Sequence, residues 1–187
     1  AGMMCAIESA KRGRRTLLVD HAAKIGGKIL ISGGGRCNFT NVGASPGQYV
    51  SENPHFCKSA FSRFKPSDFI ALVEKHGIAY HEKKLGQLFC DGSAQAIVDL
   101  LASECREAGA EFRLGCKIEA VDPDADGSGY VVQTSQGAIR CQSLVIATGG
   151  LSIPKIGATG LGYQIARQFG LAVTETAPAL DGFTLKD

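Results

Sequence analysis

The sequence predicts an α/β fold in which helices cover a mostly parallel, doubly wound sheet. Three observations predict it: a helix–strand–acid unit at the start of the chain, a buried apolar run that ends in two glycines near residue 150, and a glycine-rich turn that opens a late helix. The chain has 187 residues, of which 44% are hydrophobic and 20% charged, which is ordinary for a globular domain with a core.

The first unit is a helix followed by a strand and an acid. Apolar residues recur at helical spacing over residues 3–10, and Gly13 stands where a C-terminal cap falls. The β-prone run 16–19 then ends in Asp20, as in the second half of a βαβ dinucleotide unit. There Gly2 corresponds to the third glycine of G-x-G-x-x-G, and Asp20 accepts hydrogen bonds from a ribose. The first strand and first two glycines are missing from the chain, and such half-units also occur without a nucleotide.

A second feature is the run of three glycines in the stretch 32–41. Such a run favours neither a helix nor a strand. Because it has no β-carbons, it lets a large ligand approach the backbone closely. Arg36 follows directly, so the expected ligand is anionic. A flexible surface loop is the alternative.

Two features near the end of the chain support the same fold. Residues 144–146 form a continuous apolar run, as expected for a parallel strand that is covered on both faces, and the run leads to Gly149 and Gly150. Residues 157–163 form a glycine-rich turn before an amphipathic helix, and such a turn presents free amides to an anion such as pyrophosphate. Each feature alone is also compatible with ordinary turn chemistry.

The middle of the chain predicts regular elements in a consistent order. We expect helices at 53–64, 67–76 and 93–108, strands at 78–82, 87–90 and 111–114, and an antiparallel meander at 118–121, 129–134 and 138–141.

Composition narrows the function classes. A net charge of +2 without an evident basic cluster argues against nucleic acid, and no apolar run is long enough for a membrane helix. The seven cysteines are an odd number without C-x-x-C, which argues against a disulfide framework or a metal site and fits a cytoplasmic location. Cys37 beside Arg36 is the one candidate thiolate, although a structural role is favoured. No catalytic acid, base or nucleophile can be named.

Several motifs resemble the aminoacetone-oxidase-like or BaiN-like bacterial flavoproteins, which are NAD(P)/FAD-dependent oxidoreductases. They are Ala1-Gly2-Met3-Met4-Cys5-Ala6, Lys28-Ile29-Leu30-Ile31-Ser32-Gly33-Gly34-Gly35-Arg36-Cys37-Asn38 with Thr40-Asn41, Ala147-Thr148-Gly149-Gly150, and Gly157-Ala158-Thr159-Gly160 with Gly162-Tyr163. The similarity runs through essentially the whole chain. It implies a glutathione-reductase-like, Rossmann-type FAD-binding domain whose meander is the crossover, represented by its N-terminal part without the first strand.

The resemblance also implies a set of cofactor-binding residues for FAD. Pyrophosphate lies near Gly2, the adenosine ribose binds Asp20, and the adenine meets the backbone at Ile118. The residues expected to border the rest of the cofactor are Lys28, Ser32, Gly33, Gly34, Gly35, Arg36, Cys37, Asn38, Thr148, Gly149, Gly150 and Gly160.

The expected organisation is a partial FAD-binding domain at 1–173, followed at 174–187 by the start of a connection to a second, substrate-side domain. Asp181-Gly182 stands where relatives typically show Val-Pro.

The expected function is a flavin-dependent oxidoreductase that passes a hydride or electrons between flavin and NAD(P)H or a small organic substrate. The alternatives are an FAD-binding protein without turnover and a flavin-dependent RNA-modifying protein. The expected partner is a small molecule, with no nucleic acid, membrane or metal, and the oligomeric state is not predicted.

Overall fold

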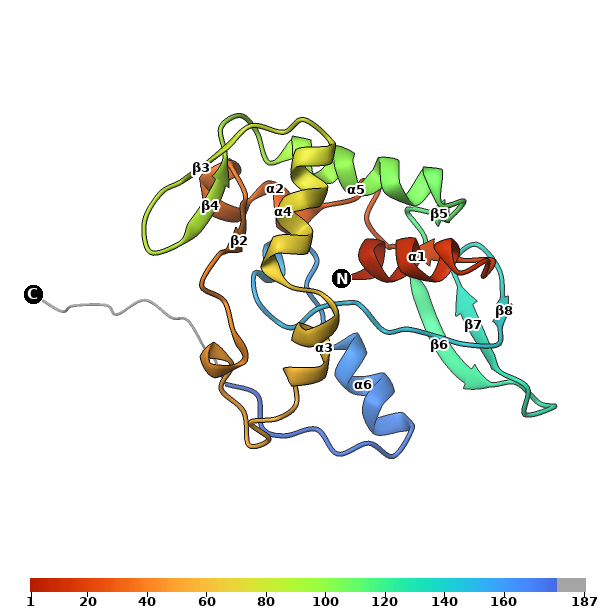
Figure 1. Ribbon diagram of the computed structural model, residues 1–187. Helices are drawn as coiled ribbons and strands as arrows, with labels where there is room; N and C mark the ends of the chain where they lie inside the picture. The colour runs from red at the N-terminus through yellow and green to blue at the C-terminus, as the bar shows by residue number, and fades with distance from the viewer. Residues whose placement is uncertain (178–187) are drawn as a thin grey trace, which may run out of the picture.

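The structure is a computed structural model that describes residues 1–177 of the chain (Figure 1). It confirms the predicted α/β class. The helices are α1 (Gly2–Lys11), α2 (Gly27–Leu30), α3 (Lys58–Arg63), α4 (Pro66–Lys75), α5 (Gln95–Glu107) and α6 (Leu161–Gln168). The strands are β1 (Leu17–Val19), β2 (Asn38–Asn41), β3 (Tyr80–Glu82), β4 (Gln87–Cys90), β5 (Glu111–Arg113), β6 (Ile118–Pro123), β7 (Tyr130–Thr134) and β8 (Ile139–Cys141). Short 3₁₀ turns are η1 (Ser32–Gly35), η2 (Pro46–Gln48) and η3 (Pro154–Ile156).

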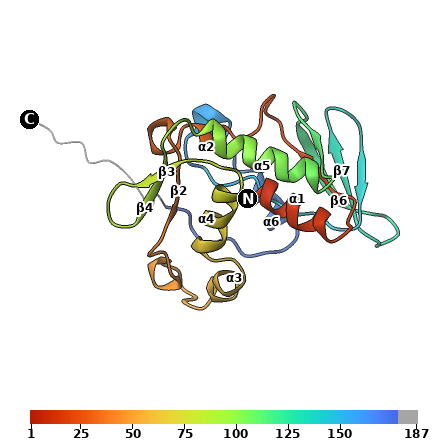
Figure 2. The same cartoon turned by 45° about the horizontal axis from the view of Figure 1, so that its top comes forward.

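The first layer pairs β1 with β5 in parallel, in the register Leu17 to Glu111 and Val19 to Arg113. Helices α1 and α5 pack on each other beside this pair, as both views show (Figures 1 and 2). Ile7 of α1 and Ile97 and Leu100 of α5 are almost fully buried in the core there. Burial of each such side chain stabilises the fold by about 1.5–3 kcal/mol, so the apolar stripes of these helices fix how α1 lies on β1.

The predicted meander is confirmed. Strands β6, β7 and β8 form one antiparallel sheet, in which Val121 lies opposite Val132. Its apolar face packs against α6 through Ile165, and Gln168 Nε2 donates a 2.6 Å hydrogen bond to the carbonyl of Val121. The meander therefore holds α6, whose N-terminus follows the glycine-rich turn.

A third sheet was only partly predicted. The hairpin β3–β4 is confirmed, but β2 was expected to be part of a ligand loop and instead pairs antiparallel with β4, with Asn41 opposite Gln87. The order of this sheet is β2-β4-β3. Figures 1 and 2 place it at one end of the molecule and the meander at the other, with α1 and α5 between them.

Two predicted elements are corrected by the structure. The expected parallel strand at 144–146 forms no ladder with any residue of 1–177, and Val145 and Ile146 are 62% and 41% exposed. A parallel strand depends on hydrogen bonds to a neighbour, and no described segment supplies one here. The expected helix at 53–64 begins only at Lys58, because Asn53 Oδ1 accepts the amide of His55 in a turn around Pro54. The Asp181-Gly182 departure and most of the expected interdomain connection lie outside the described residues.

Candidate cofactor site

The N-terminus of α1 offers unpaired backbone donors. The first intrahelical bond runs from Cys5 N–H to the Ala1 carbonyl at 3.0 Å, so the amides of Gly2, Met3 and Met4 have no acceptor within the helix. Ala1 provides no side-chain cap, and the first turn contains no acid. Free amides at the positive end of a ten-residue helix suit an anion such as pyrophosphate.

Gly2 lies close to two other parts of the expected site. A β-carbon at this position would lie 3.6 Å from the side chains of both Leu18 and Ala147. These are ordinary van der Waals contacts, so the helix packing itself tolerates a methyl group here. The contact with Ala147 brings the start of α1 next to the segment that contains Thr148.

Asp20 lies at the carboxyl end of β1. Its amide donates to the Arg113 carbonyl at 3.0 Å and its own carbonyl accepts the Cys116 amide at 2.9 Å, which places it beside the turn that leads to Ile118 in β6. One carboxylate oxygen accepts the Ala22 amide at 2.9 Å. The other oxygen has no hydrogen-bond partner among the described residues and is free to accept from hydroxyl groups of a ligand.

The segment Thr148–Gly150 lies between the beginnings of α1 and α6. Gly160 is the N-cap of α6, and a β-carbon on Gly162 in its first turn would lie 2.8 Å from Thr148 Oγ1. The left-handed conformation of Gly149, with φ +73°, turns the chain there. Two helix N-termini thus border one short segment.

Helix α2 connects this group to the next loop. Lys28 Nζ donates a 2.6 Å hydrogen bond to Ser152 Oγ, and a β-carbon on Gly157 would lie 2.5 Å from His21 Nε2. The segment 150–157 therefore rests against residues 21–28. Lys28 is an exposed cation and could bind an anionic group in place of the serine hydroxyl.

The glycine loop at 32–38 is tied to its surroundings and is not a free linker. Gly33, Gly34 and Gly35 have φ of +56°, +67° and +86°, which other residues adopt only with strain. The Gly35 carbonyl accepts the Ala94 amide at 2.7 Å, and the Arg36 carbonyl accepts the Cys90 amide at 3.1 Å. The loop is thereby fixed to β4 and to the residue before α5.

The side chains of this loop point in different directions. Arg36 and Asn38 are exposed, whereas Cys37 is buried in the core at an unusual φ of +54°. Across the β2–β4 pair, burial and the proximity of Cys37 raise the pKa of the Cys90 thiol to about 11. The burial of Cys37 favours the structural role over the reactive one.

The structure thus brings the expected residues together in two groups with α2 between them. Gly2, Asp20, Ile118, Thr148, Gly149, Gly150 and Gly160 lie around the ends of α1, β1 and α6, and the loop from Ser32 to Asn38 is held by β4 and by Ala94 before α5. Sequence reasoning missed His21 and Ser152 as neighbours of this site. No local pattern marks them, because the returning segment 150–157 alone brings them there.

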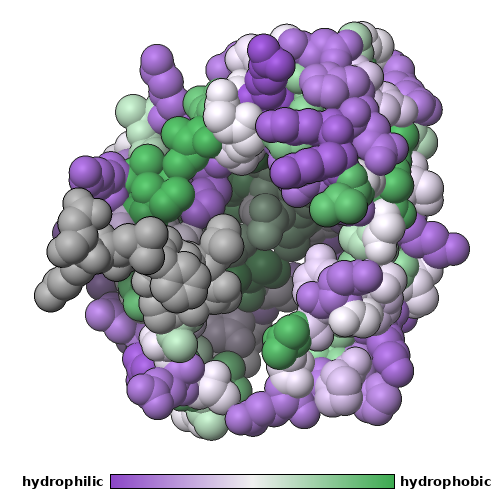
Figure 3. Space-filling view, turned by 90° about the vertical axis from the view of Figure 1, so that its left-hand side faces the viewer, coloured by the Kyte–Doolittle hydropathy of each residue, from purple (hydrophilic) through white to green (hydrophobic). Residues whose placement is uncertain are grey.

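No described helix has the length and apolar character needed to cross a membrane. Within residues 1–177, no group of three or more His, Cys, Asp or Glu side chains is arranged to hold a metal ion. The face seen in Figure 3 is hollowed near its centre, and apolar side chains are visible inside the hollow.

These features define a Rossmann-type α/β domain of the FAD-binding kind. The chain belongs to the HI0933-like family, since the family described as "HI0933-like protein Rossmann domain" matches residues 1–185. The expected fold class is therefore confirmed.

Three curated relatives are similar over nearly the whole chain. The "Ribosomal RNA dihydrouridine synthase" of Escherichia coli K12 is 55% identical over 99% of this chain and 46% of its own length. The protein of the same name from Haemophilus influenzae is 47% identical over 100% of this chain and 47% of its own length. The "3-dehydro-bile acid delta(4,6)-reductase" of Clostridium scindens is 26% identical over 96% of this chain and 44% of its length. The chain thus spans about half the length of the relatives it matches.

Solved structures agree on the fold alone. Glycine oxidase from Geobacillus kaustophilus superposes with a TM-score of 0.56 at 19% identity, over 84% of this chain and 54% of that one. Thermovibrio ammonificans THI4 gives 0.52 at 16% identity, over 91% and 59%.

One expectation is overturned by these comparisons. The exclusion of nucleic acid is wrong, because the relatives at 55% and 47% identity are both named for an activity on ribosomal RNA. The exclusion rested on the small net charge and on the lack of an evident basic cluster in the sequence, and neither reports how cations are distributed over the folded surface.

Proposed function

We propose that this chain is the cofactor-binding portion of an FAD-dependent oxidoreductase that forms dihydrouridine in ribosomal RNA. The observation that carries the proposal is the similarity, over 99% and 100% of the chain, to two proteins that bear this name. The reductase name of the Clostridium scindens relative supports the reductive direction. The BaiN-like resemblance then describes a distant branch of the same family.

The residues of the site fit FAD. The free amides of Gly2, Met3 and Met4 would receive the pyrophosphate, and the open carboxylate oxygen of Asp20 would accept hydrogen bonds from the adenosine ribose. The backbone at Ile118 would meet the adenine, since Asp20 and Cys116 are hydrogen-bonded beside it. Lys28, the glycine loop and the segment 148–150 would border the rest of the FAD molecule.

When bound, the flavin would supply the hydride for saturation of the C5–C6 double bond of uracil, and a proton from an acid or from water would complete the addition. The chain's own contribution is position and electrostatics. The N-terminus of α6, capped by Gly160, presents a positive dipole end beside Thr148, where it can stabilise negative charge. The rigid attachment of the glycine loop to β4 keeps its backbone in one place while a ligand binds.

Reduction of the flavin between turnovers needs an electron donor, and NAD(P)H is the donor we propose. Anaerobic addition of NADH or NADPH to the purified full-length protein should bleach the flavin absorbance. The alternative of an FAD-binding protein without catalysis would be favoured by two results together. Neither NADH nor NADPH would reduce the flavin, and protein reduced with dithionite would form no dihydrouridine in ribosomal RNA.

The activity is tested in cells that lack the gene. Nucleosides from ribosomal RNA of the deletion strain should contain less dihydrouridine by mass spectrometry, and the full-length wild-type gene should restore it. The matched variant Asp20→Ala should restore much less, because cofactor binding is weakened. An unchanged dihydrouridine content in the deletion strain would refute the proposed function.

A further inference from the structure

One exposed segment alternates aromatic and cationic side chains. We call its members the α3 surface, which consists of Tyr49, Phe56, Lys58, Phe61, Arg63, Phe64 and Lys65. Glu52 is the one acid in the sequence between Tyr49 and Lys65, and no Asp or Glu occurs from residue 53 to residue 67. Asp68, the next acid, is occupied as the helix cap, since its carboxylate accepts the Lys65 amide at 2.6 Å.

The aromatic rings of the α3 surface are open to solvent. Phe56 is 81% exposed, Tyr49 56% and Phe64 44%. Single exposed apolar residues are common, but here three large exposed rings lie within 16 residues of the chain. Tyr49 and Phe61 pack edge to face with centroids 5.2 Å apart, which holds the Tyr49 ring in place.

The cations of the α3 surface are uncompensated. Lys58, Arg63 and Lys65 form no ion pair with any described residue. The basic run at residues 11–15 differs in this respect, apart from Arg14, which forms no ion pair with any described residue. Lys11 pairs with Glu104 at 2.7 Å, Arg12 with Glu8 at 3.4 Å and Arg15 with Glu111 at 3.9 Å.

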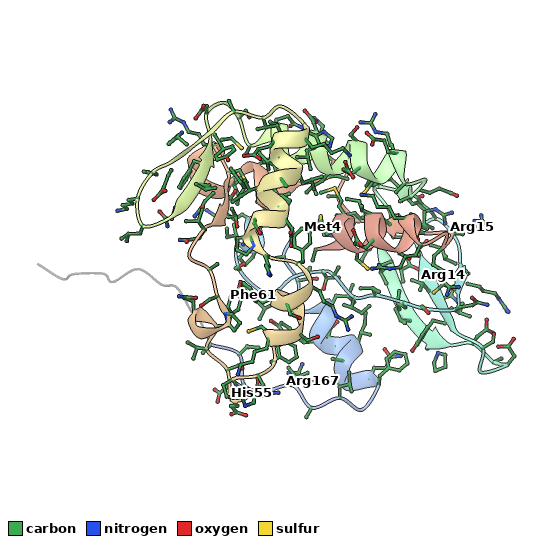
Figure 4. The ribbon with its side chains drawn as sticks, in the orientation of Figure 1. Met4, Arg14, Arg15, His55, Phe61 and Arg167 are labelled. Carbon is green, nitrogen blue, oxygen red and sulfur yellow. The ribbon has the colours of Figure 1, made fainter. Side chains whose placement is uncertain are left out.

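The α3 surface also contains a groove of about 510 Å³. Lys58 and Lys65 line it together with Phe61, and Pro46 lies among the other lining residues. Figure 4 shows Phe61 and His55 on this segment, at a distance from Arg14 and Arg15 beside the meander. An aromatic ring and two ammonium groups that line the same groove are suited to a base with its flanking phosphates.

We propose that the α3 surface binds single-stranded RNA; this inference rests on the proposed function and assigns the RNA a docking site. Lys58, Arg63 and Lys65 pair with phosphates, and the exposed rings stack on unpaired bases. A folded protein partner would need a matching acidic surface to pair with these cations, whereas an RNA strand carries a negatively charged phosphate at every nucleotide.

The first test measures binding of a fluorescent 20-nucleotide oligouridine to the full-length, flavin-loaded protein at several salt concentrations. The variant Lys58→Gln/Arg63→Gln/Lys65→Gln should bind about 10- to 100-fold more weakly, with a salt slope smaller by about 2, since each phosphate contact on a single strand contributes about 0.7. The matched control Arg12→Gln/Arg14→Gln/Arg15→Gln removes the same charge and should stay within about threefold of wild type.

The second test uses the rings and does not depend on those variants folding. Photocrosslinking to 5-bromouridine RNA should label peptides that contain Tyr49 or Phe56, and Phe56→Ala should weaken binding by about fivefold or more. Crosslinks that map elsewhere, or equal losses in both triple variants, would overturn the α3 surface while leaving the proposed function intact. If Lys58→Gln/Arg63→Gln/Lys65→Gln melts at a lower temperature but binds RNA as wild type does, the docking site is also overturned, and this face instead packs against another part of the protein. Wild-type protein that binds no oligouridine would also overturn the α3 surface, whereas the dihydrouridine content of the deletion strain decides the proposed function separately.

Discussion

Glu104 and Lys11, which are 93 residues apart in the sequence, form an ion pair of 2.7 Å between α5 and α1. Lys75 Nζ and His76 Nε2 at the end of α4 approach the other carboxylate oxygen at 2.6 and 3.0 Å. Glu104 is only 1% exposed. Hydrogen bonds from Lys11, Lys75 and His76 outweigh burial and hold the pKa of Glu104 at about 2, below its usual range.

The lowered pKa makes stability depend on acidity. A carboxyl group whose pKa falls from 4.5 to about 2 on folding stabilises the protein above pH 4.5 and loses that contribution as the pH falls toward 2. The contribution is about 3 kcal/mol. Urea unfolding between pH 6 and pH 2 should therefore show a decline in the free energy of unfolding that is smaller in Glu104→Gln by about this amount. Glu107→Gln, on the same helix, is the matched control and should behave as wild type.

Asp20→Ala should weaken FAD binding by about 1–3 kcal/mol, the size expected for a lost hydrogen bond to a charged group. Fluorescence titration of the full-length apoprotein with FAD measures the change. Asp122→Ala, on the meander, removes the same charge away from β1 and should bind FAD normally. An affinity for FAD that Asp20→Ala leaves unchanged would rule out the ribose contact.

The glycine loop supports a paired test of close packing. A β-carbon on Gly33 would lie 2.7 Å from the Asn38 nitrogen and 2.8 Å from the Phe89 ring, whereas one on Gly34 would meet nothing within 4 Å. Both residues have positive φ. Gly34→Ala should therefore cost only the backbone strain, about 1–2 kcal/mol, and Gly33→Ala clearly more. Similar melting temperatures for the two variants would argue against this packing.

The contact between Gly162 and Thr148 should be visible as a coupling. Gly162→Ala places a β-carbon 2.8 Å from Thr148 Oγ1 and should lower stability by about 1–3 kcal/mol. Thr148→Ala removes the atom that is struck, so the double variant should recover part of the loss. Strictly additive free energies of unfolding would mean that α6 does not rest on this segment.

Elements with their own periodicity could be predicted from the sequence. The apolar spacing of α1, α5 and α6 and the short strands of the meander carry their signal locally, and the structure agrees with them. Strand β2 carries no such signal. Asn38–Asn41 contains one apolar residue, and it is a strand because β4 pairs with it. The run 144–146 shows the converse, since a strong apolar pattern without a neighbour forms no strand.

The candidate site follows the same division. Gly2 and Asp20 could be predicted because their positions relative to one helix and one strand define them. His21 and Ser152 could not, because the segment 150–157 reaches them only after the chain has crossed the meander. The α3 surface could not be predicted from the net charge, because its cations are balanced in the total by acids elsewhere in the chain.

The Glu104 cluster has a consequence for how this chain can change over evolutionary time. Lys11 lies in the last turn of the helix whose first turn has the free amides that we propose for the pyrophosphate, so the cluster fixes the helix that presents those amides. Loss of the carboxylate alone would leave the cations close together without a counter-charge. Loss of one lysine alone would leave the buried carboxylate with less compensating positive charge. We expect substitutions at Lys11, Lys75, His76 and Glu104 to covary among relatives, with an apolar residue at position 104 accompanied by uncharged partners.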